Sequence, residues 1–99
     1  MVVRASSGSG GGGGSATYDI QNNLAPNTNY TVTLNNGFVL LANAVYDTVW
    51  VAVVVENGVA TLVHKQNNAL YSYSGGVLTV KNAYTPYGNT DYLATYVVD

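Results

Sequence analysis

Short apolar runs, each four to nine residues long and separated by Asn and Gly, fill the chain from Tyr18 to its end. Two-residue loops such as Asn-Gly and Gly-Gly between runs of this kind are typical of tight β-hairpins, because both turn residues can adopt a positive φ angle. Three loops fit: Asn36-Gly37 between residues 30–35 and 38–42, Asn57-Gly58 between 48–56 and 59–64, and Gly75-Gly76 between 70–74 and 77–80. The pattern therefore predicts three successive hairpins.

A seventh run at residues 92–98 is expected to form a last strand, and residues 16–20 allow an eighth. Asn67-Asn68 is expected to turn the chain between the second and third hairpins. The chain is rich in Val, Thr and Tyr, which favour strands, and poor in strong helix formers. The predicted fold is all-β, a β-sandwich or a jelly-roll-like small barrel of seven or eight antiparallel strands.

The hairpin at Gly75-Gly76 is expected to have one apolar face and one polar face. Pairing across the turn places Tyr73 opposite Leu78 and Tyr71 opposite Val80. Ser and Thr occupy most positions of the other face, so this hairpin needs to be covered on one side only.

The hairpin at Asn57-Gly58 is instead apolar on both faces. Counting back from the turn places Val51, Val53, Val55, Ala60 and Leu62 on one face and Trp50, Ala52, Val54, Val59 and Val63 on the other. The same count places Trp50 opposite Lys65 and His64 opposite Val51.

A strand pair that is apolar on both sides needs two covers, and the second sheet of a sandwich supplies one of them. The other cover is a loop of the same chain, the N-terminal segment, or a partner molecule. Under the last interpretation, the partner-binding residues of this hairpin are Trp50, Ala52, Val54 and Val63.

Residues 1–17 differ in composition from residues 18–99, since six of the eleven glycines lie between Gly8 and Gly14. This composition predicts an extended, flexible arm attached to a single β domain; the alternative is an engineered linker. Ordering about 17 residues costs on the order of 1–2 kcal/mol each. An ordered arm therefore has to be held by another surface, and its expected anchors are Val2, Val3 and Arg4.

The charge content argues against several classes of protein. Only 8% of the residues are charged, and the formal net charge is −2, whereas a typical soluble domain is about a quarter charged. Three cations in the whole chain cannot form the basic stripe that a nucleic-acid module needs. No run reaches the roughly 18 apolar residues of a membrane helix, and the first residues lack the apolar core of a secretion signal. We therefore expect a chain made in the cytoplasm that binds neither nucleic acid nor a membrane.

Catalytic and metal-binding chemistry is also poorly represented. The chain has no cysteine, one histidine and five acidic residues without a metal-ligand spacing. The serines of the arm lie in no nucleophile motif, and the glycine run lacks the ending of a phosphate loop. We expect no cofactor, no metal and no enzymatic activity, and we interpret His64 as a structural residue.

One segment has the composition of a binding loop. Residues 84–92 combine Tyr84, Tyr87 and Tyr92 with Pro, Gly and Asn. Tyrosine offers a large rigid surface and one hydrogen bond at a small entropic cost. Tyr84 and Tyr87 are therefore candidates for binding a protein neighbour or a sugar ring; the alternative is that these tyrosines cap the end of the sandwich.

In composition and in phrases such as Val-Glu-Asn-Gly-Val-Ala-Thr-Leu and Ser-Gly-Gly-Val-Leu-Thr-Val, the chain resembles small virion proteins of tailed bacteriophages, above all capsid decoration or cement proteins. The resemblance implies a β-sandwich or jelly-roll body with an extended N-terminal arm. It also implies a homo-oligomer, with a trimer favoured, on the outer surface of the capsid, where it clamps the major capsid protein or another virion protein.

The expected function is therefore that of a non-enzymatic capsid decoration protein, which stabilises the shell through its β body and its arm. The alternative is a phage fibre or a receptor- or carbohydrate-binding tip module that uses the loop from Tyr84 to Tyr92.

Overall fold

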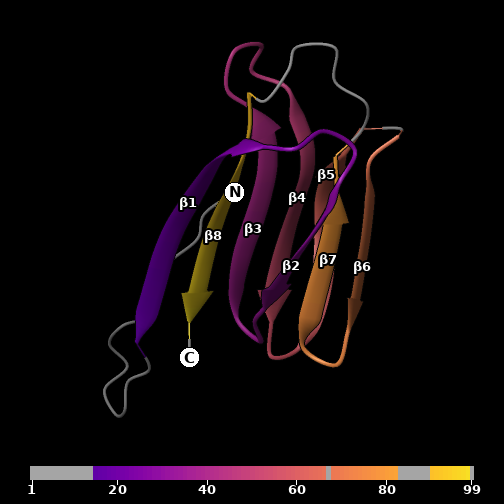
Figure 1. Ribbon diagram of the computed structural model, residues 1–99. Helices are drawn as coiled ribbons and strands as arrows, with labels where there is room; N and C mark the ends of the chain where they lie inside the picture. Colours follow the sequence, from indigo (N-terminus) through magenta and orange to yellow (C-terminus); the bar gives the residue numbers. More distant parts are fainter. Residues whose placement is uncertain (1–14, 67, 83–89, 99) are drawn as a thin grey trace.

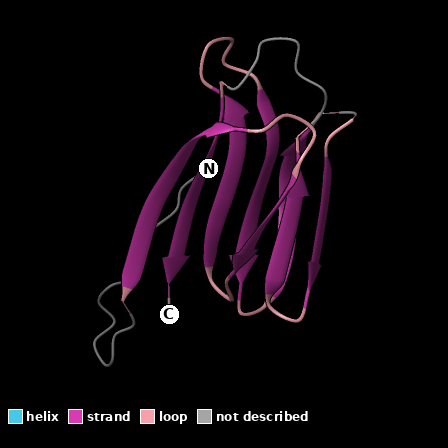
Figure 2. Cartoon of the chain, viewed as in Figure 1, coloured by secondary structure: helices cyan, strands magenta, loops and turns pink. Residues whose placement is uncertain are grey.

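The structure, a computed structural model, describes residues 15–66, 68–82 and 90–98, and it places them in strands and turns (Figures 1 and 2). The strands are β1 (Ala16–Leu24), β2 (Asn29–Thr33), β3 (Gly37–Asn43), β4 (Val49–Glu56), β5 (Val59–Lys65), β6 (Leu70–Ser74), β7 (Val77–Lys81) and β8 (Asp91–Val98). They form a five-stranded sheet in the order β1-β8-β3-β4-β5 and a three-stranded sheet in the order β2-β7-β6, and every pairing is antiparallel. The predicted all-β sandwich is confirmed. The described residues contain no helix that could cross a membrane.

The core lies between the two sheets. Alternate residues of β3 and β4 are almost fully buried on the inner face of the five-stranded sheet: Val39, Leu41, Val51, Val53 and Val55. The three-stranded sheet contributes Leu78 and Val80 from β7, flanked by the half-buried rings of Tyr30, Tyr71 and Tyr73. Burying one such aliphatic side chain contributes about 1.5–3 kcal/mol. The β4 residues of one predicted apolar face of the β4–β5 hairpin are thus covered by the second sheet, whereas Leu62 of β5 on that face is 37% exposed.

The three-stranded sheet does not extend over β1, which lies beyond its edge (Figure 1). Asp19 pairs with Thr95, and Thr95 pairs with the buried Val39, so Asp19 points to the core side of the sheet. Asp19 and its neighbours on that side, Thr17 and Gln21, are nevertheless exposed. Three strands are too few to cover five, and the sequence places polar residues where the cover is missing.

Two of the three predicted hairpins are confirmed. β4 pairs with β5 across Asn57-Gly58, and both turn residues have positive φ angles of 49° and 76°. β6 pairs with β7 across Gly75-Gly76, with φ angles of 60° and 82°. These angles are those that a type I′ turn requires. The expected pairs Tyr73–Leu78 and Tyr71–Val80 are both present.

The predicted hairpin at Asn36-Gly37 is wrong. β2 pairs with β7 and β3 pairs with β4 and β8, so this segment carries the chain from one sheet to the other. Both neighbouring turns hold it: the Leu34 amide donates to the Gly76 carbonyl, and the Asn35 carbonyl accepts from the Gly58 amide, each at 2.9 Å. An Asn-Gly signal marks a change of direction, but it does not say which strand the chain pairs with afterwards.

The register of the β4–β5 hairpin departs from the simple count beyond Val53. Val53 pairs with Leu62 as expected, but Ala52 pairs with His64 and Val51 with Lys65. Val63 is the extra residue of a β-bulge, which adds one residue to one strand and shifts all later pairs. The expected pairs Trp50–Lys65 and His64–Val51 are therefore wrong.

Gly37 is the position where a side chain is least tolerated. Its φ angle is 140°, and a Cβ atom placed on it would lie 1.8 Å from the backbone oxygen of Tyr96. We expect Gly37→Ala to lower the free energy of unfolding by about 3 kcal/mol or more, because β3 and β8 would have to separate. Urea denaturation measures this loss.

Gly75→Ala is the matched control for this measurement. Gly75 also has a positive φ angle, but no atom lies within 4 Å of the added Cβ. Its cost is only that of the left-handed backbone, roughly 1–2 kcal/mol. Equal losses for the two variants would show that the contact between Gly37 and Tyr96 does not constrain the sheet.

Candidate functional site

The two outward faces of the sandwich have opposite character. The face of the three-stranded sheet is mostly hydrophilic and is formed by Asn29, Thr31, Thr33, Ser72, Ser74, Thr79 and Lys81, with Leu70 and Val77 at its margins. The face of the five-stranded sheet is largely apolar from β1 to β4, and its charged residue, Glu56, lies at the end of β4 beside the turn. A sandwich that is exposed to water on both sides normally alternates polar and apolar residues in every strand.

Two rows of side chains form this second face. The strand registers align Tyr18, Tyr96, Phe38 and Val54 in one row, and Ile20, Ala94, Leu40 and Ala52 in the next. These eight residues from β1, β8, β3 and β4 are called the apolar outer face below. On β5 the rows end at the exposed side chains of Thr61 and His64.

Aromatic rings make up the more prominent row. Tyr18 is 59% exposed, and Phe38 and Tyr96 are half-buried, with ring centroids 6.2 Å apart and an interplanar angle of 37°. The row that contains Ala94 and Ala52 projects less from the sheet, because these two small side chains are 3% and 5% exposed between larger neighbours. The face is thus uneven and rich in rigid side chains, as the centres of protein interfaces are.

The alternation of apolar and polar residues in β1 is opposite to that of a strand that only closes the core. In β1 the apolar residues Tyr18 and Ile20 point away from the core side, and the polar residues Thr17, Asp19 and Gln21 point toward it. A strand that only closed the sandwich would have the opposite pattern. Because Tyr18 and Ile20 contact no core, their apolar character is explained by a surface outside the described residues.

Trp50 does not belong to the apolar outer face, which corrects the expectation that it shares a face with Ala52 and Val54. Leu41 pairs with Val51 and Ala42 with Val49, so Trp50 is the extra residue of a second bulge. Its side chain is 9% exposed and packs in the core. The alternation that the sequence predicts is broken here, and the ring turns inward.

Trp50 points inward because a buried carboxylate accepts its N–H group. Asp91 Oδ1 accepts from Trp50 Nε1 at 2.9 Å and from Asn43 Nδ2 at 3.0 Å, and Asp91 Oδ2 accepts from Asn82 Nδ2. Asn82 Oδ1 in turn accepts from the Thr28 amide at 2.9 Å. Asp91 and Asn82 are fully buried, and no buried polar side-chain atom of the described residues lacks a partner. The cluster is saturated by its own bonds, and it is structural.

The other expected binding residues have different positions. Val63 is 49% exposed in the bulge of β5, at the opposite edge of the sheet from β1. The expected anchors of the arm, Val2, Val3 and Arg4, lie outside the described residues, as do Tyr84 and Tyr87.

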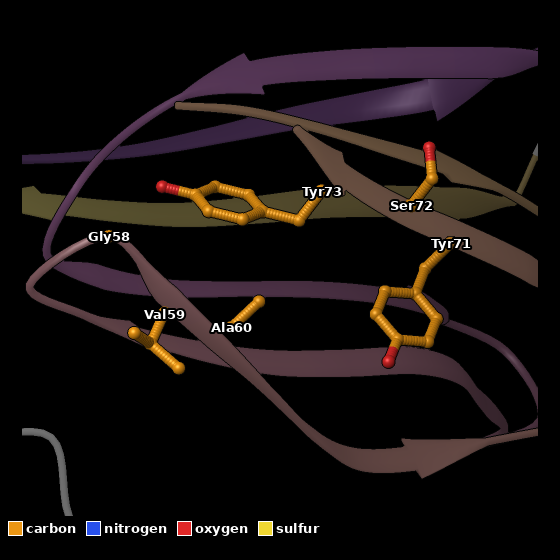
Figure 3. Close-up of a pocket in the computed structure, with 6 residues that line it drawn as sticks. All are labelled: Gly58, Val59, Ala60, Tyr71, Ser72 and Tyr73. Atoms are coloured by element: carbon orange, nitrogen blue, oxygen red, sulfur yellow. The ribbon is translucent and has the colours of Figure 1, made fainter. Parts of the chain in front are cut away.

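No catalytic arrangement is formed by the described residues. No group of three or more His, Asp or Glu residues among them could hold a metal ion. A groove at the side of the sandwich, between the first residues of β5 and β6, is lined by Gly58, Val59, Ala60, Tyr71, Ser72 and Tyr73 (Figure 3). It offers no charged group, and the Tyr73 hydroxyl already donates to the Leu34 carbonyl at 2.7 Å. The groove is the gap between the two sheets at the edge strands β5 and β6.

Comparison with protein-family models, with curated proteins and with solved structures found no match to this chain.

Counting residues back from the Asn57-Gly58 turn in the sequence identified only part of the apolar outer face. Ala52 and Val54 lie on it, whereas Tyr18, Ile20, Phe38, Leu40, Ala94 and Tyr96 were not identified from the sequence. The signal for Tyr18 and Ile20 is present as a strict alternation of apolar and polar residues over positions 16–21. Its meaning depends on which side of β1 faces the second sheet, and an isolated strand does not reveal that side.

Replacing the central carboxylate tests the role of the buried cluster. Asp91→Asn keeps the shape of the side chain but turns an amide group toward donor groups. We expect the free energy of unfolding to fall by about 2–4 kcal/mol, because at least one buried donor loses its acceptor. Trp50, the only tryptophan, reports the unfolding transition by its fluorescence.

Asp47→Asn serves as the control, since Asp47 is exposed and Asn also tolerates its positive φ angle. We expect a change within about 0.5 kcal/mol for this variant. A loss for Asp91→Asn that is no larger than this would contradict a structural role of the cluster.

Proposed function

We propose that this chain is a non-enzymatic assembly protein, and specifically a bacteriophage capsid decoration protein. It binds the major capsid protein, or another virion protein, on the outer surface of the capsid through the apolar outer face and the N-terminal arm. The resemblance in composition and sequence style supports the assignment to virions. The observation that supports binding by the body is the two uncharged rows of apolar side chains, one of them largely aromatic, on the outer face of the five-stranded sheet.

An exposed apolar face of this kind is costly unless it is covered. Tyr18 and Ile20 are 59% and 46% exposed, and no charged side chain interrupts the two rows from β1 to β4. Contiguous apolar patches on soluble proteins mark association sites. An exposed sheet face suits docking on a broad protein surface better than it suits a small ligand, because small molecules bind in concave pockets.

The arm adds a second point of attachment. Residues 1–15 precede Ala16 at the start of β1, which is the edge strand of the apolar outer face. Fully extended, this length of chain spans about 50 Å, enough to reach from the docked body to a neighbouring subunit. Two linked weak contacts give an avidity well above that of either contact alone.

Charging the apolar outer face should abolish docking without unfolding the chain. Val54 is half-buried beside Phe38 at the β4 end of the aromatic row, so Val54→Lys would place a cation in the interface. We expect binding to capsid shells of the same virus, assembled from the major capsid protein, to weaken at least tenfold, because a buried charge without a partner is strongly unfavourable. Cosedimentation measures the binding.

Thr79→Lys is the matched control, because Thr79 lies on the central strand of the other sheet and points outward. This variant should bind like the unmodified chain. If the unmodified chain does not sediment with the shells, the assignment as a decoration protein is wrong. Equal weakening by both variants would remove the apolar outer face as the docking site.

Deleting residues 1–15 separates the contribution of the arm from that of the fold. The deletion leaves all eight strands intact, so the melting temperature should stay nearly unchanged. Binding to the shells should weaken, because the second attachment is lost. Unchanged binding by the truncated chain would show that the arm takes no part in attachment.

A further inference from the structure

We propose that two copies of this chain pair through their β1 strands, antiparallel and with Tyr18 of one copy opposite Tyr18 of the second copy. The pairing joins two five-stranded sheets into one continuous sheet. It rests on the geometry of β1 alone and holds whether or not the partner surface belongs to a capsid.

β1 has a free edge to which another strand can be added. Within residues 15–66, 68–82 and 90–98, it pairs only with β8, and eight of its nine residues are exposed. Its register with β8 is regular from Ala16 to Gln21, and the first irregularity comes only after Gln21. This regular stretch contains no Pro, Lys or bulge, and the one feature in it that protects edge strands is the charge of Asp19, which points to the core side.

The other edge strands are protected. β5 carries the bulge at Val63 and ends in Lys65, whose Nζ donates to the Ala69 carbonyl at 3.0 Å. β2 and β6, the edges of the three-stranded sheet, have only five residues each. Short and bulged edges resist the addition of a strand, so β1 is the edge that favours it.

The sides of β1 restrict which registers are possible. In an antiparallel pair, directly opposite residues lie on the same side of the sheet, so the apolar outer face continues only if apolar residues meet apolar residues. Registers centred on Tyr18 or on Asp19 satisfy this condition over five residues of the regular stretch. Registers centred on Thr17 or on Ile20 satisfy the condition over only three residues of this stretch.

Charge decides between the two remaining registers. Centring on Asp19 places two carboxylates directly opposite each other, which destabilises a strand pair. Centring on Tyr18 places Asp19 opposite Thr17 of the second copy and Ile20 opposite Ala16 of the second copy. It also stacks the two exposed Tyr18 rings on one side, where aromatic cross-strand pairs are favourable.

No strand of the described residues covers the core side of β1. The three-stranded sheet stops short of β1 (Figure 1), and the side chains of Thr17, Asp19 and Gln21 are exposed on that side. A two-fold axis through Tyr18 keeps both three-stranded sheets on the same side of the joined sheet. The two apolar outer faces then form one face of twice the width, and the two arms start at opposite ends of the joint.

Disulfide trapping tests the register. The chain has no cysteine, so each introduced thiol is the only one present. Opposite residues of antiparallel strands have Cα atoms about 4.5–5.5 Å apart, which lies within the range that a disulfide accepts. We expect Tyr18→Cys to form a covalent dimer on oxidation with diamide at least tenfold faster than Thr17→Cys or Asp19→Cys does alone.

A second measurement retains Tyr18. Mixing Thr17→Cys with Asp19→Cys should give a mixed dimer, because these two positions lie opposite each other in the proposed register. Sedimentation of the unmodified chain should show a species of twice 10.4 kDa. Faster self-linking of Asp19→Cys, or equal rates at all three positions, would overturn the register. A monomer or a trimer in sedimentation would overturn the two-fold pairing, while binding to capsid shells would still be tested separately by Val54→Lys.

Discussion

The relative position of the two sheets depends on the hydrogen bonds that the buried carboxylate of Asp91 accepts. This carboxylate holds the ends of β3 and β4 through Asn43 and Trp50, and it reaches the three-stranded sheet through Asn82, which follows β7. Apolar contacts in the core are not directional, so they permit many relative positions of two sheets. A buried carboxylate that accepts three directional hydrogen bonds permits far fewer. The cluster thereby fixes which side of each strand faces the core.

Once the sheets are fixed, their unequal widths determine the surface. Three strands cover the middle of a five-stranded sheet and leave β1 without a cover. The polar residues of β1 then face the solvent beside the three-stranded sheet, and Tyr18 and Ile20 extend the rows of Phe38 and Leu40 on the far side. The exposure of Tyr18 and Ile20 and the free edge of β1 thus have one origin, since both follow from the position of β1 relative to the second sheet.

The sequence predicted local structure well and long-range arrangement poorly. Positive-φ residues at Asn57-Gly58 and Gly75-Gly76 define their hairpins within a few residues, which is why these were confirmed. Asn36-Gly37 has the same signal, but its role depends on bonds to turns formed by distant residues. Trp50 looked like a surface residue because a bulge and a carboxylate 41 positions away decide its orientation. Neither effect is visible in the spacing of apolar residues.

Hydroxyl-radical footprinting of the isolated chain and of the chain bound to capsid shells tests most directly whether the apolar outer face is the docking surface. Tyr18, Phe38 and Tyr96 should be oxidised more slowly in the bound state. Leu70 and Val77, which lie on the outward face of the three-stranded sheet and are 56% and 37% exposed, should react at the same rate in both states. Protection of Leu70 and Val77 with no protection of the three aromatic residues would contradict docking through the five-stranded sheet.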